Sequence, residues 1–148
     1  QIVALDPKPR PDLHFTRVAL MTPNRSEALQ LAGLSATEGK AFPGSDVAAR
    51  IHERFAPEYL VVTLGADGML LSTGGRPGRH LATAAREVFD VSGAGDTVIA
   101  TLAAALAAGA DIERAASLAN LAAGVVVGKL GTATATPAEI LARAPQGG

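Results

Sequence analysis

The sequence lacks cysteine and tryptophan and contains one tyrosine and four phenylalanines. Without cysteine, the chain has neither a disulfide framework nor a thiolate metal site, and this composition fits a reducing compartment. The 13 lysines and arginines are balanced by 14 acidic residues, so the net charge of -1 provides no basic face for nucleic acid. We therefore expect small molecules or proteins as partners, and the cytoplasm as the compartment.

Long hydrophobic runs are also missing. The longest, residues 98–110, falls short of the roughly 18 to 20 residues that cross a bilayer. Residues 1–8 lack the layout of a signal peptide and look like a buried strand that is already under way. We expect no membrane segment. The 148 residues suffice for a packed core, and we expect them to be the later part of a longer protein.

Short apolar runs closed by turn residues, such as the one before Asp6-Pro7, have the composition of buried parallel strands. Segments between them carry apolar residues at helical spacing. This alternation predicts an α/β fold, and Asp67-Gly68 predicts an antiparallel hairpin within it. The expected strands are 2–5, 18–21, 59–64, 69–72 and 80–84, and the expected helices in this part of the chain are 24–31 and 47–55.

Two alanine-rich helices are expected in the second half, over residues 95–108 and 112–127. Gly109 is the expected C-terminal cap of the first, and Asp111 is the expected N-cap of the second. Both helices are apolar nearly all round, so we expect each to be covered on two sides. Residues 145–148 are expected to fray.

The run DVSGAGDTVIATLAAAL, residues 90–106, places small residues directly before the first of these helices. Backbone N–H groups at such a helix start, together with the helix dipole, favour an anion. A carboxylate at Asp96 repels that anion, so it suits a general base that takes a proton from a hydroxyl. A plain helix cap at Asp96 is the alternative. A dinucleotide fingerprint is excluded because Val98 stands where its third glycine is required.

The same run resembles the C-terminal motif of the ribokinase-like sugar kinases, the phosphofructokinase B superfamily. The resemblance implies that Asp96 is the catalytic base. It also implies that the backbone of Gly93, Ala94 and Gly95 forms the anion hole of a phosphoryl-transfer site.

Two segments earlier in the chain resemble the same family. TPNRSE is similar to its Asn-x-x-Glu motif, which implies that Asn24 and Glu27 lie near the nucleotide phosphates and Mg²⁺. Read alone, these two residues have the spacing of a capping box. VTLGADG is similar to the nucleotide-binding hairpin, which implies that Thr63, Gly65 and Gly68 lie near the phosphates. A plain hairpin with a glycine turn is the alternative.

The run LANLAAGVVVGKLGT resembles the last helix and loop of the family, with Asn120 on the adenine side. Asp90, Ser92 and Gly131 match positions that hold a monovalent cation such as K⁺, and serine stands at 92 where threonine is commoner. Lys8 follows the first expected strand. A solvated lysine is the favoured interpretation there, and a phosphate contact is the alternative.

The resemblance implies a ribokinase-like, three-layer α/β/α fold with a mainly parallel sheet. Residues 1–148 would be the later, C-terminal and nucleotide-binding part of such a kinase domain. Within the family the chain is most similar to the heptose 7-phosphate kinases of lipopolysaccharide synthesis. That similarity implies ATP and Mg²⁺ as cofactors, and D-glycero-D-manno-heptose 7-phosphate, phosphorylated at its anomeric hydroxyl, as substrate. Another carbohydrate kinase of this family and a non-catalytic nucleotide-binding module remain as alternatives.

The resemblance does not include the early strands, the Gly-Gly motif or the small sheet that covers the sugar in this family. We therefore expect this chain alone to be weak or inactive as a kinase. We also expect it to expose apolar surface, and to pair with a missing N-terminal half or to form a homo-oligomer.

Overall fold

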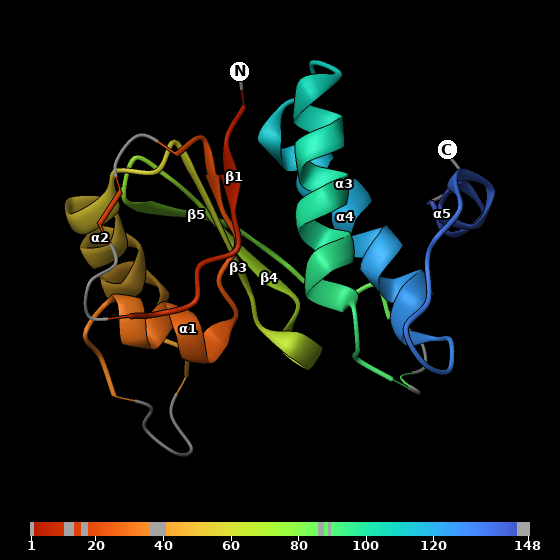
Figure 1. Ribbon diagram of the computed structural model, residues 1–148, viewed down its shortest axis with the longest axis horizontal. Helices are drawn as coiled ribbons and strands as arrows, with labels where there is room; N and C mark the ends of the chain where they lie inside the picture. The colour runs from red at the N-terminus through yellow and green to blue at the C-terminus, as the bar shows by residue number, and fades with distance from the viewer. Residues whose placement is uncertain are drawn as a thin grey trace. The chain divides into compact units, whose positions relative to one another are not determined.

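The computed structural model describes residues 2–10, 14–15, 18–35, 41–85, 88 and 90–144 (Figure 1). The chain forms two compact units, Gln1–Leu81 and Ala82–Gly148. The first unit combines a sheet with helices, and the second is helical. Among the described residues, no helix has both the length and the apolar character that a membrane crossing requires.

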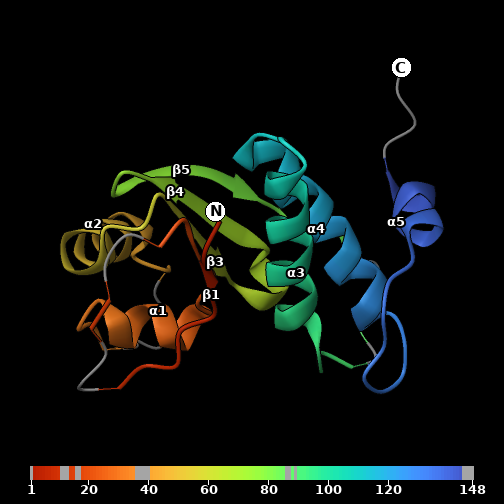
Figure 2. The ribbon, with the colours of Figure 1, turned by 45° about the horizontal axis from the view of Figure 1, so that its top comes forward.

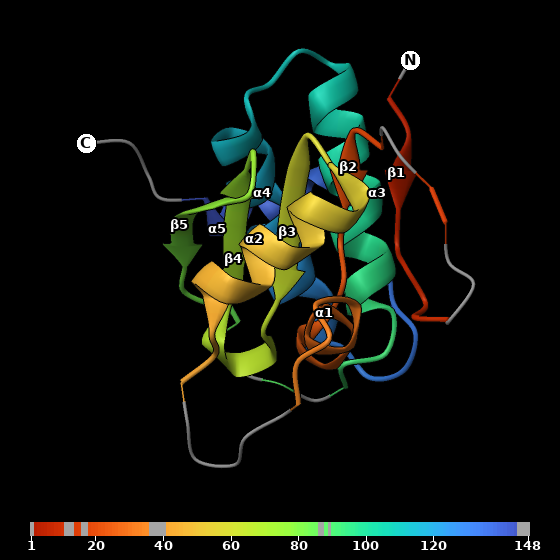
Figure 3. The same ribbon diagram turned by 90° about the vertical axis from the view of Figure 1, so that its left-hand side faces the viewer.

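A five-stranded sheet forms the centre of the first unit, and its strands lie side by side in chain order from β1 to β5 (Figure 3). β1, β2 and β3 pair in parallel, β4 is antiparallel to β3, and β5 is antiparallel to β4. Of these described strands only β4 is therefore reversed, which confirms the prediction of a mainly parallel sheet. The strands are β1 Ala4–Leu5, β2 Leu20–Met21, β3 Tyr59–Thr63, β4 Met69–Thr73 and β5 Arg76–Leu81.

Two helices, α1 (Arg25–Leu31) and α2 (Gly44–Phe55), pack on one face of this sheet (Figures 1 and 3). Side chains alternate between the two faces of a strand, so Leu60 and Val62 of β3 point to the same side. Both belong to a buried cluster with residues of α1 and α2, including Ile51 and Phe55. This cluster fixes the helices against the strands, and with them the loops that connect strands to helices.

The predicted hairpin joins β3 to β4. The chain turns through a short 3₁₀ helix, Gly65–Asp67, and the Leu64 N–H donates to the Gly68 carbonyl at 2.8 Å. Gly65 and Gly68 have φ angles of 65° and 85°, in the left-handed region that glycine adopts without steric cost. The antiparallel hairpin predicted from Asp67-Gly68 is thus confirmed.

The second unit contains α3 (Ala94–Ala107), α4 (Ile112–Val127) and α5 (Pro137–Arg143). α3 packs along α4, and α5 contacts α4 (Figure 2). The Asp111 side chain accepts the Arg114 N–H at 2.8 Å, and Gly109 follows α3 with a φ of 88°. These contacts confirm both alanine-rich helices and the Asp111 cap, whereas the C-cap of α3 is Ala108 and Gly109 is the left-handed residue that follows it.

The expectation that both alanine-rich helices are covered on two sides holds better for α4 than for α3. Eight residues of α4 are buried, whereas in α3 only Val98 and Leu102 are. Several alanines of α3, among them Ala100 and Ala104, are exposed. An alanine side chain is one methyl group, so a helix can expose it at little cost and a high mean hydropathy overstates the burial.

Three expectations about the elements are corrected by the structure. The strand expected at 80–84 is β5, Arg76–Leu81, which is mostly exposed and is defined by its pairing with β4. Ile2 and Val3, expected in a buried strand, precede β1 and are 39% and 51% exposed, because β1 is an edge strand. Helix α5 was not expected. The frayed end expected at residues 145–148 lies outside the described residues.

Candidate functional site

The helix start predicted to carry catalysis is built on Gly93, the N-cap of α3. Its φ of 79° is left-handed, and no side chain caps the helix. Thr97 binds the Gly93 carbonyl twice, with its hydroxyl at 2.9 Å and its N–H at 3.0 Å. A side chain at position 93 would strain this backbone, so glycine is required by the turn itself.

The backbone N–H groups around this turn differ in their engagement. The Ala94 N–H donates to the Val91 carbonyl at 3.2 Å, so this part of the predicted anion hole is already paired in the structure. Within the described residues, the N–H groups of Gly93, Gly95 and Asp96 have no acceptor. Unpaired N–H groups at a helix start, reinforced by the helix dipole, are suited to an anion.

Asp96 lies in the first turn of α3 and is exposed. No cation or donor among the described residues contacts its carboxylate. A side-chain carbon added at Gly95 would meet nothing within 4 Å, so the space beside this turn is open. An unpaired carboxylate next to unpaired amides can accept a proton while the amides hold a neighbouring anion.

The three residues predicted to hold a monovalent cation lie together in the second unit. The Asp90 side chain accepts the Ser92 N–H at 2.8 Å. Hydrogen bonds from the Ser92 backbone and side chain, and a weaker one from the Gly131 backbone, hold the pKa of Asp90 below its ordinary value. Asp90 therefore stays ionised, and carboxylate and backbone oxygens are donors that suit a hard cation.

The side chain of Asn120, predicted on the adenine side, is occupied by backbone. Its amide nitrogen donates to the Ala82 carbonyl at 2.7 Å, and its oxygen accepts the Ala84 N–H at 3.3 Å. A side-chain carbon at Gly124, one turn further along α4, would lie 3.1 Å from the Ala84 carbonyl carbon. Asn120 and Gly124 thus fix residues 82–85 along α4. An adenine contact of Asn120 stays a prediction, and it would require these bonds to open.

In the first unit, Asn24 and Glu27 form the capping box that was the alternative interpretation. The Asn24 side chain accepts the Glu27 N–H at 3.0 Å, and the Glu27 carboxylate accepts the Asn24 N–H at 2.9 Å. The Thr63 N–H donates to the Pro23 carbonyl at 3.0 Å, which forms a bridge between Asn24 and the end of β3. The structure therefore brings Asn24, Glu27 and Thr63 to one edge of the sheet, at the carboxyl ends of β2 and β3.

Lys8 reaches the same edge. Its ammonium lies 2.9 Å from Glu27 Oε1 and 3.1 Å from Asp6 Oδ2. The Glu27 hydrogen bond, followed by the one to Asp6, raises the pKa of Lys8 above its ordinary value. The expectation of a solvated lysine is thus only half right, since the side chain is 66% exposed but bound to two carboxylates. Glu27 is 19 residues away in sequence, so no local pattern indicates this pair.

Arg25 ties the hairpin to α1, and the sequence analysis missed it. Its guanidinium forms an ion pair with Asp67 and donates to the Leu64 carbonyl at 3.5 Å. It also lies over the Phe42 ring, 5.5 Å from the centroid. These contacts hold the glycine turn beside the Asn24–Glu27 segment.

Within the described ranges, no group of three or more His, Asp or Glu side chains is placed to hold a metal. Mg²⁺ in nucleotide enzymes is commonly bound through one or two carboxylates together with phosphate oxygens. Glu27 supplies one such carboxylate, and Asp6 is the second carboxylate bound to the Lys8 ammonium. The donors at this edge therefore fit a metal that arrives with a nucleotide.

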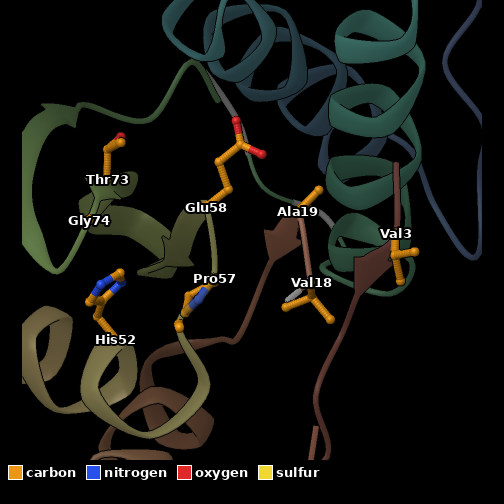
Figure 4. Close-up of a pocket in the computed structure, with 9 residues that line it drawn as sticks. Val3, Val18, Ala19, His52, Pro57, Glu58, Thr73 and Gly74 are labelled. Atoms are coloured by element: carbon orange, nitrogen blue, oxygen red, sulfur yellow. The ribbon is translucent and has the colours of Figure 1, made fainter. Parts of the chain in front are cut away.

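A hollow of about 520 Å³ lies elsewhere in the first unit, at the amino ends of β2 and β3 (Figure 4). Its lining includes Val18, His52, Glu58 and Thr73, and none of the predicted site residues. The Nδ1 atom of His52 is buried without a hydrogen-bond partner among the described residues. The hollow and the Asn24–Glu27 segment thus occupy opposite ends of the parallel strands.

Comparison with known proteins identifies relatives along most of the chain. Residues 2–139 match the family described as pfkB family carbohydrate kinase. The protein named bifunctional protein HldE from Halorhodospira halophila is 51% identical over 141 residues, which make up 93% of this chain and 28% of that protein. The protein of the same name from Azotobacter vinelandii is 49% identical over 138 residues, again 93% and 28% of the two chains.

Solved structures give the same result for the fold. Ribokinase from Thermotoga maritima superposes with a TM-score of 0.80 at 26% identity and covers 96% of this chain and 48% of its own. Ribokinase from Arabidopsis thaliana, solved with ribose and ATP, gives a TM-score of 0.72 at 27% identity over 85% of this chain and 40% of its own. The predicted ribokinase-like α/β fold is confirmed. The chain spans a little over a quarter of the curated relatives and under half of these kinases.

Proposed function

Because the chain belongs to the pfkB family of carbohydrate kinases, we propose that it supplies the nucleotide-binding surface and the catalytic base for phosphoryl transfer. The donor is ATP and the acceptor is a hydroxyl group of a sugar phosphate. The similarity to a ribokinase solved with ATP supports the choice of nucleotide. We place the reaction in the cytoplasm, where ATP is available.

The observation that carries this proposal is the start of α3, where unpaired amides and an unpaired carboxylate lie within one helical turn. In the proposed step the sugar oxygen forms a bond to the γ-phosphorus as the bond to the ADP oxygen breaks. Asp96 takes the hydroxyl proton, and the amides of Gly93 and Gly95 stabilise negative charge on the transferring group. The Ala94 amide joins them if its bond to Val91 opens.

The residues predicted from the family motifs are each assigned a role toward the nucleotide or its metal. Glu27 would hold Mg²⁺, which when bound neutralises phosphate charge, and Asn24, Thr63, Gly65 and Gly68 would lie along the phosphates. The ion pair of Arg25 with Asp67 holds the hairpin turn beside α1, and this position supports the assignment. Asp90, Ser92 and Gly131 would hold a monovalent cation, K⁺ in our proposal, which when bound adds positive charge near the start of α3.

For the acceptor we propose D-glycero-β-D-manno-heptose 7-phosphate, converted to the 1,7-bisphosphate on the way to ADP-heptose and lipopolysaccharide. The 51% and 49% identity to proteins named bifunctional protein HldE supports this choice over other carbohydrates. The sugar pocket would be completed either by an N-terminal part of the protein or by a second copy of the chain. The short share of each relative that the chain covers supports this requirement.

The product of the complete natural gene should be tested with ATP, Mg²⁺ and a panel of acceptors. The panel contains heptose 7-phosphate, fructose 6-phosphate, ribose and adenosine, and phosphorus NMR detects the new anomeric phosphate. We expect turnover of heptose 7-phosphate at least about tenfold faster than any other acceptor, the size of discrimination that contacts to a substrate's extra groups provide. Preference for another acceptor would redirect the substrate assignment, and no turnover of any acceptor would contradict the kinase proposal.

A second candidate is a non-catalytic nucleotide-binding module. It is favoured by the full engagement of Asn24 and Glu27 in a capping box, which needs no ligand. This candidate predicts ATP binding by calorimetry without turnover, even in the complete gene product.

A further inference from the structure

Both carboxylate oxygens of Glu27 are occupied in the structure. Oε2 accepts the Asn24 N–H at 2.9 Å, and Oε1 accepts the Lys8 ammonium at 2.9 Å. The Glu27 side chain is only 13% exposed, so it has little room for additional ligands. A cation that binds Glu27 must therefore displace either the backbone of the capping box or the lysine.

Of the two partners, Lys8 is the easier to displace. The Asn24 N–H belongs to the helix start and is fixed by a reciprocal bond. The Lys8 side chain is 66% exposed and holds its ammonium on a flexible four-carbon stem. Exposed ion pairs of this kind are weak, since solvent and salt screen them.

The ammonium nevertheless stays at this edge after it leaves Glu27. Lys8 follows β1 closely, and in Figures 1 and 2 the segment that leaves β1 runs beside α1. Its second partner, Asp6, lies 3.1 Å away and keeps positive charge near the carboxyl ends of β1 and β2. Thr22, which follows β2, is 5% exposed, and its buried hydroxyl lacks a partner among the described residues. Buried hydroxyls normally have a hydrogen-bond partner, so the Thr22 hydroxyl at this edge can still form a hydrogen bond.

We propose that Lys8 is an exchangeable counter-ion of Glu27, which leaves this carboxylate when a divalent cation arrives with a nucleotide and then contacts a phosphate oxygen. The inference rests on the proposed function of the Asn24–Glu27 segment. It assigns Lys8 two opposite effects, because its ammonium competes with the metal for Glu27 but attracts the phosphates. A purely structural lysine would have neither effect.

The test uses the 148-residue chain with Lys8 replaced by methionine, which keeps the apolar stem and removes the charge. Mn²⁺ alone, followed by water-proton relaxation, reports the metal site, and Mg²⁺ with the ATP analogue AMP-PNP, followed by calorimetry, reports the nucleotide. We expect Lys8→Met to bind Mn²⁺ about 3- to 5-fold more tightly, the size of an exposed ion pair. We expect it to bind Mg·AMP-PNP about 10- to 150-fold more weakly, the size of a charged hydrogen bond to phosphate.

Three comparison variants make the result specific. Arg10→Met removes a positive charge from the same segment, and since Arg10 does not contact Glu27, it should change neither affinity by more than about twofold. Lys8→Arg keeps the charge and should bind Mn²⁺ as the wild type does. On a Glu27→Gln background, Lys8→Met should give no gain in Mn²⁺ affinity.

Affinities that both fall, or both stay unchanged, in a folded Lys8→Met chain would overturn the exchange. If the wild-type chain binds AMP-PNP and Mn²⁺ but lacks the opposite shifts, only this inference fails. If the wild-type chain binds neither, the proposed function of this segment fails and the inference fails with it.

Discussion

The predicted site residues of the Asn24–Glu27 segment and those at the start of α3 are in opposite states. In the first unit Asn24, Glu27 and Lys8 are bonded to one another or to neighbouring backbone. In the second unit Asp96 and the amides of Gly93 and Gly95 have no partner among the described residues. N–H groups at a helix start have no intrahelical acceptor, and Gly95 and Asp96 are exposed to solvent. This turn is distinguished by the absence of a side-chain cap, since the Asp96 carboxylate does not accept from these amides.

This difference separates two kinds of site residue. Groups that satisfy each other are held in position before any ligand arrives, and a ligand must replace existing bonds. Groups without partners can act on a ligand directly, as a base or as donors to an anion. Sequence motifs predict a functional role in both cases. Only the hydrogen bonds of the structure distinguish residues that already hold one another in place from residues that are free to act on a ligand.

Replacement of Asp96 is the strongest way to break this comparison. In the complete gene product, Asp96→Asn should lower kcat on the order of 10²- to 10⁴-fold, because the base is removed, while nucleotide affinity changes little. Asp111→Asn is the matched control, since Asp111 also stands at a helix start but is engaged as the cap of α4. Asparagine caps about as well as aspartate, so this control should keep its rate. An unaltered rate in Asp96→Asn would end the base assignment.

Gly95→Ala sharpens the comparison by separating stability from activity. A side-chain carbon there meets nothing within 4 Å and the residue lies inside α3, so alanine should raise helix stability by up to about 1 kcal/mol. The methyl group would enter the open space beside the unpaired amides, and we expect kcat/KM to fall about tenfold or more. Thermal unfolding and kinetics on the same variant provide the check. A stabilised variant with full activity would show that no anion approaches this turn.

Substitutions of Asn24 should have a smaller effect, and a variant that differs only in charge separates the capping role from nucleotide binding. Asn24→Ala removes the side chain that accepts the Glu27 N–H, and it should cost about 1 kcal/mol of unfolding free energy. Asn24→Asp keeps the cap and should keep the stability. Its added negative charge near the proposed phosphates should weaken ATP binding several-fold, a change of about 1 kcal/mol. Equal ATP affinity in wild type and Asn24→Asp, measured by calorimetry, would leave only the capping role.

Glu139 is a carboxylate of the second unit that is engaged by neighbouring groups, and it can be compared with the unpaired carboxylate of Asp96 in the same unit. Lys129 lies 2.7 Å away and, together with the Thr136 backbone and side chain, lowers the pKa of Glu139 to about 2. A lowered pKa in the folded state stabilises the fold above the ordinary carboxyl range. This contribution is lost as the pH falls from about 4.5 towards about 2. Lys129→Met should move the pKa of Glu139 upward, measured by NMR titration of its carboxyl carbon, and an unchanged titration would contradict the pairing.

Local sequence signals predicted the elements whose boundaries are set locally. Helix α4 begins after Asp111 and ends at Val127 as predicted, because the cap and the apolar run are contiguous in sequence. The capping box at Asn24 and Glu27 was likewise an explicit alternative. Helix α5 could have been found from the same kind of signal, since Thr136 and Glu139 form a capping box with proline at the first helical position.

Other features depend on contacts that local patterns do not encode. The sequence of β5 shows almost no alternation of apolar and polar residues. It forms a strand because its backbone pairs with that of β4. The bonds of Asn120 to Ala82 and Ala84 join residues 38 and 36 apart, and the ion pair of Arg25 with Asp67 joins residues 42 apart. The residue types at the candidate site and the local capping box could be predicted from motifs, whereas bonds between distant segments could not, because they depend on how those segments meet.

The most direct test of the account follows the backbone amides of the nitrogen-labelled 148-residue chain by NMR during a titration with Mg·AMP-PNP. The account predicts that the amide resonances of Gly93, Gly95 and Asp96 shift most in the second unit, together with those of Asn24, Gly65 and Gly68 in the first. Shifts that leave Gly95 and Asp96 unchanged at saturating nucleotide, or that centre on Val18, Glu58 and Thr73, would contradict it.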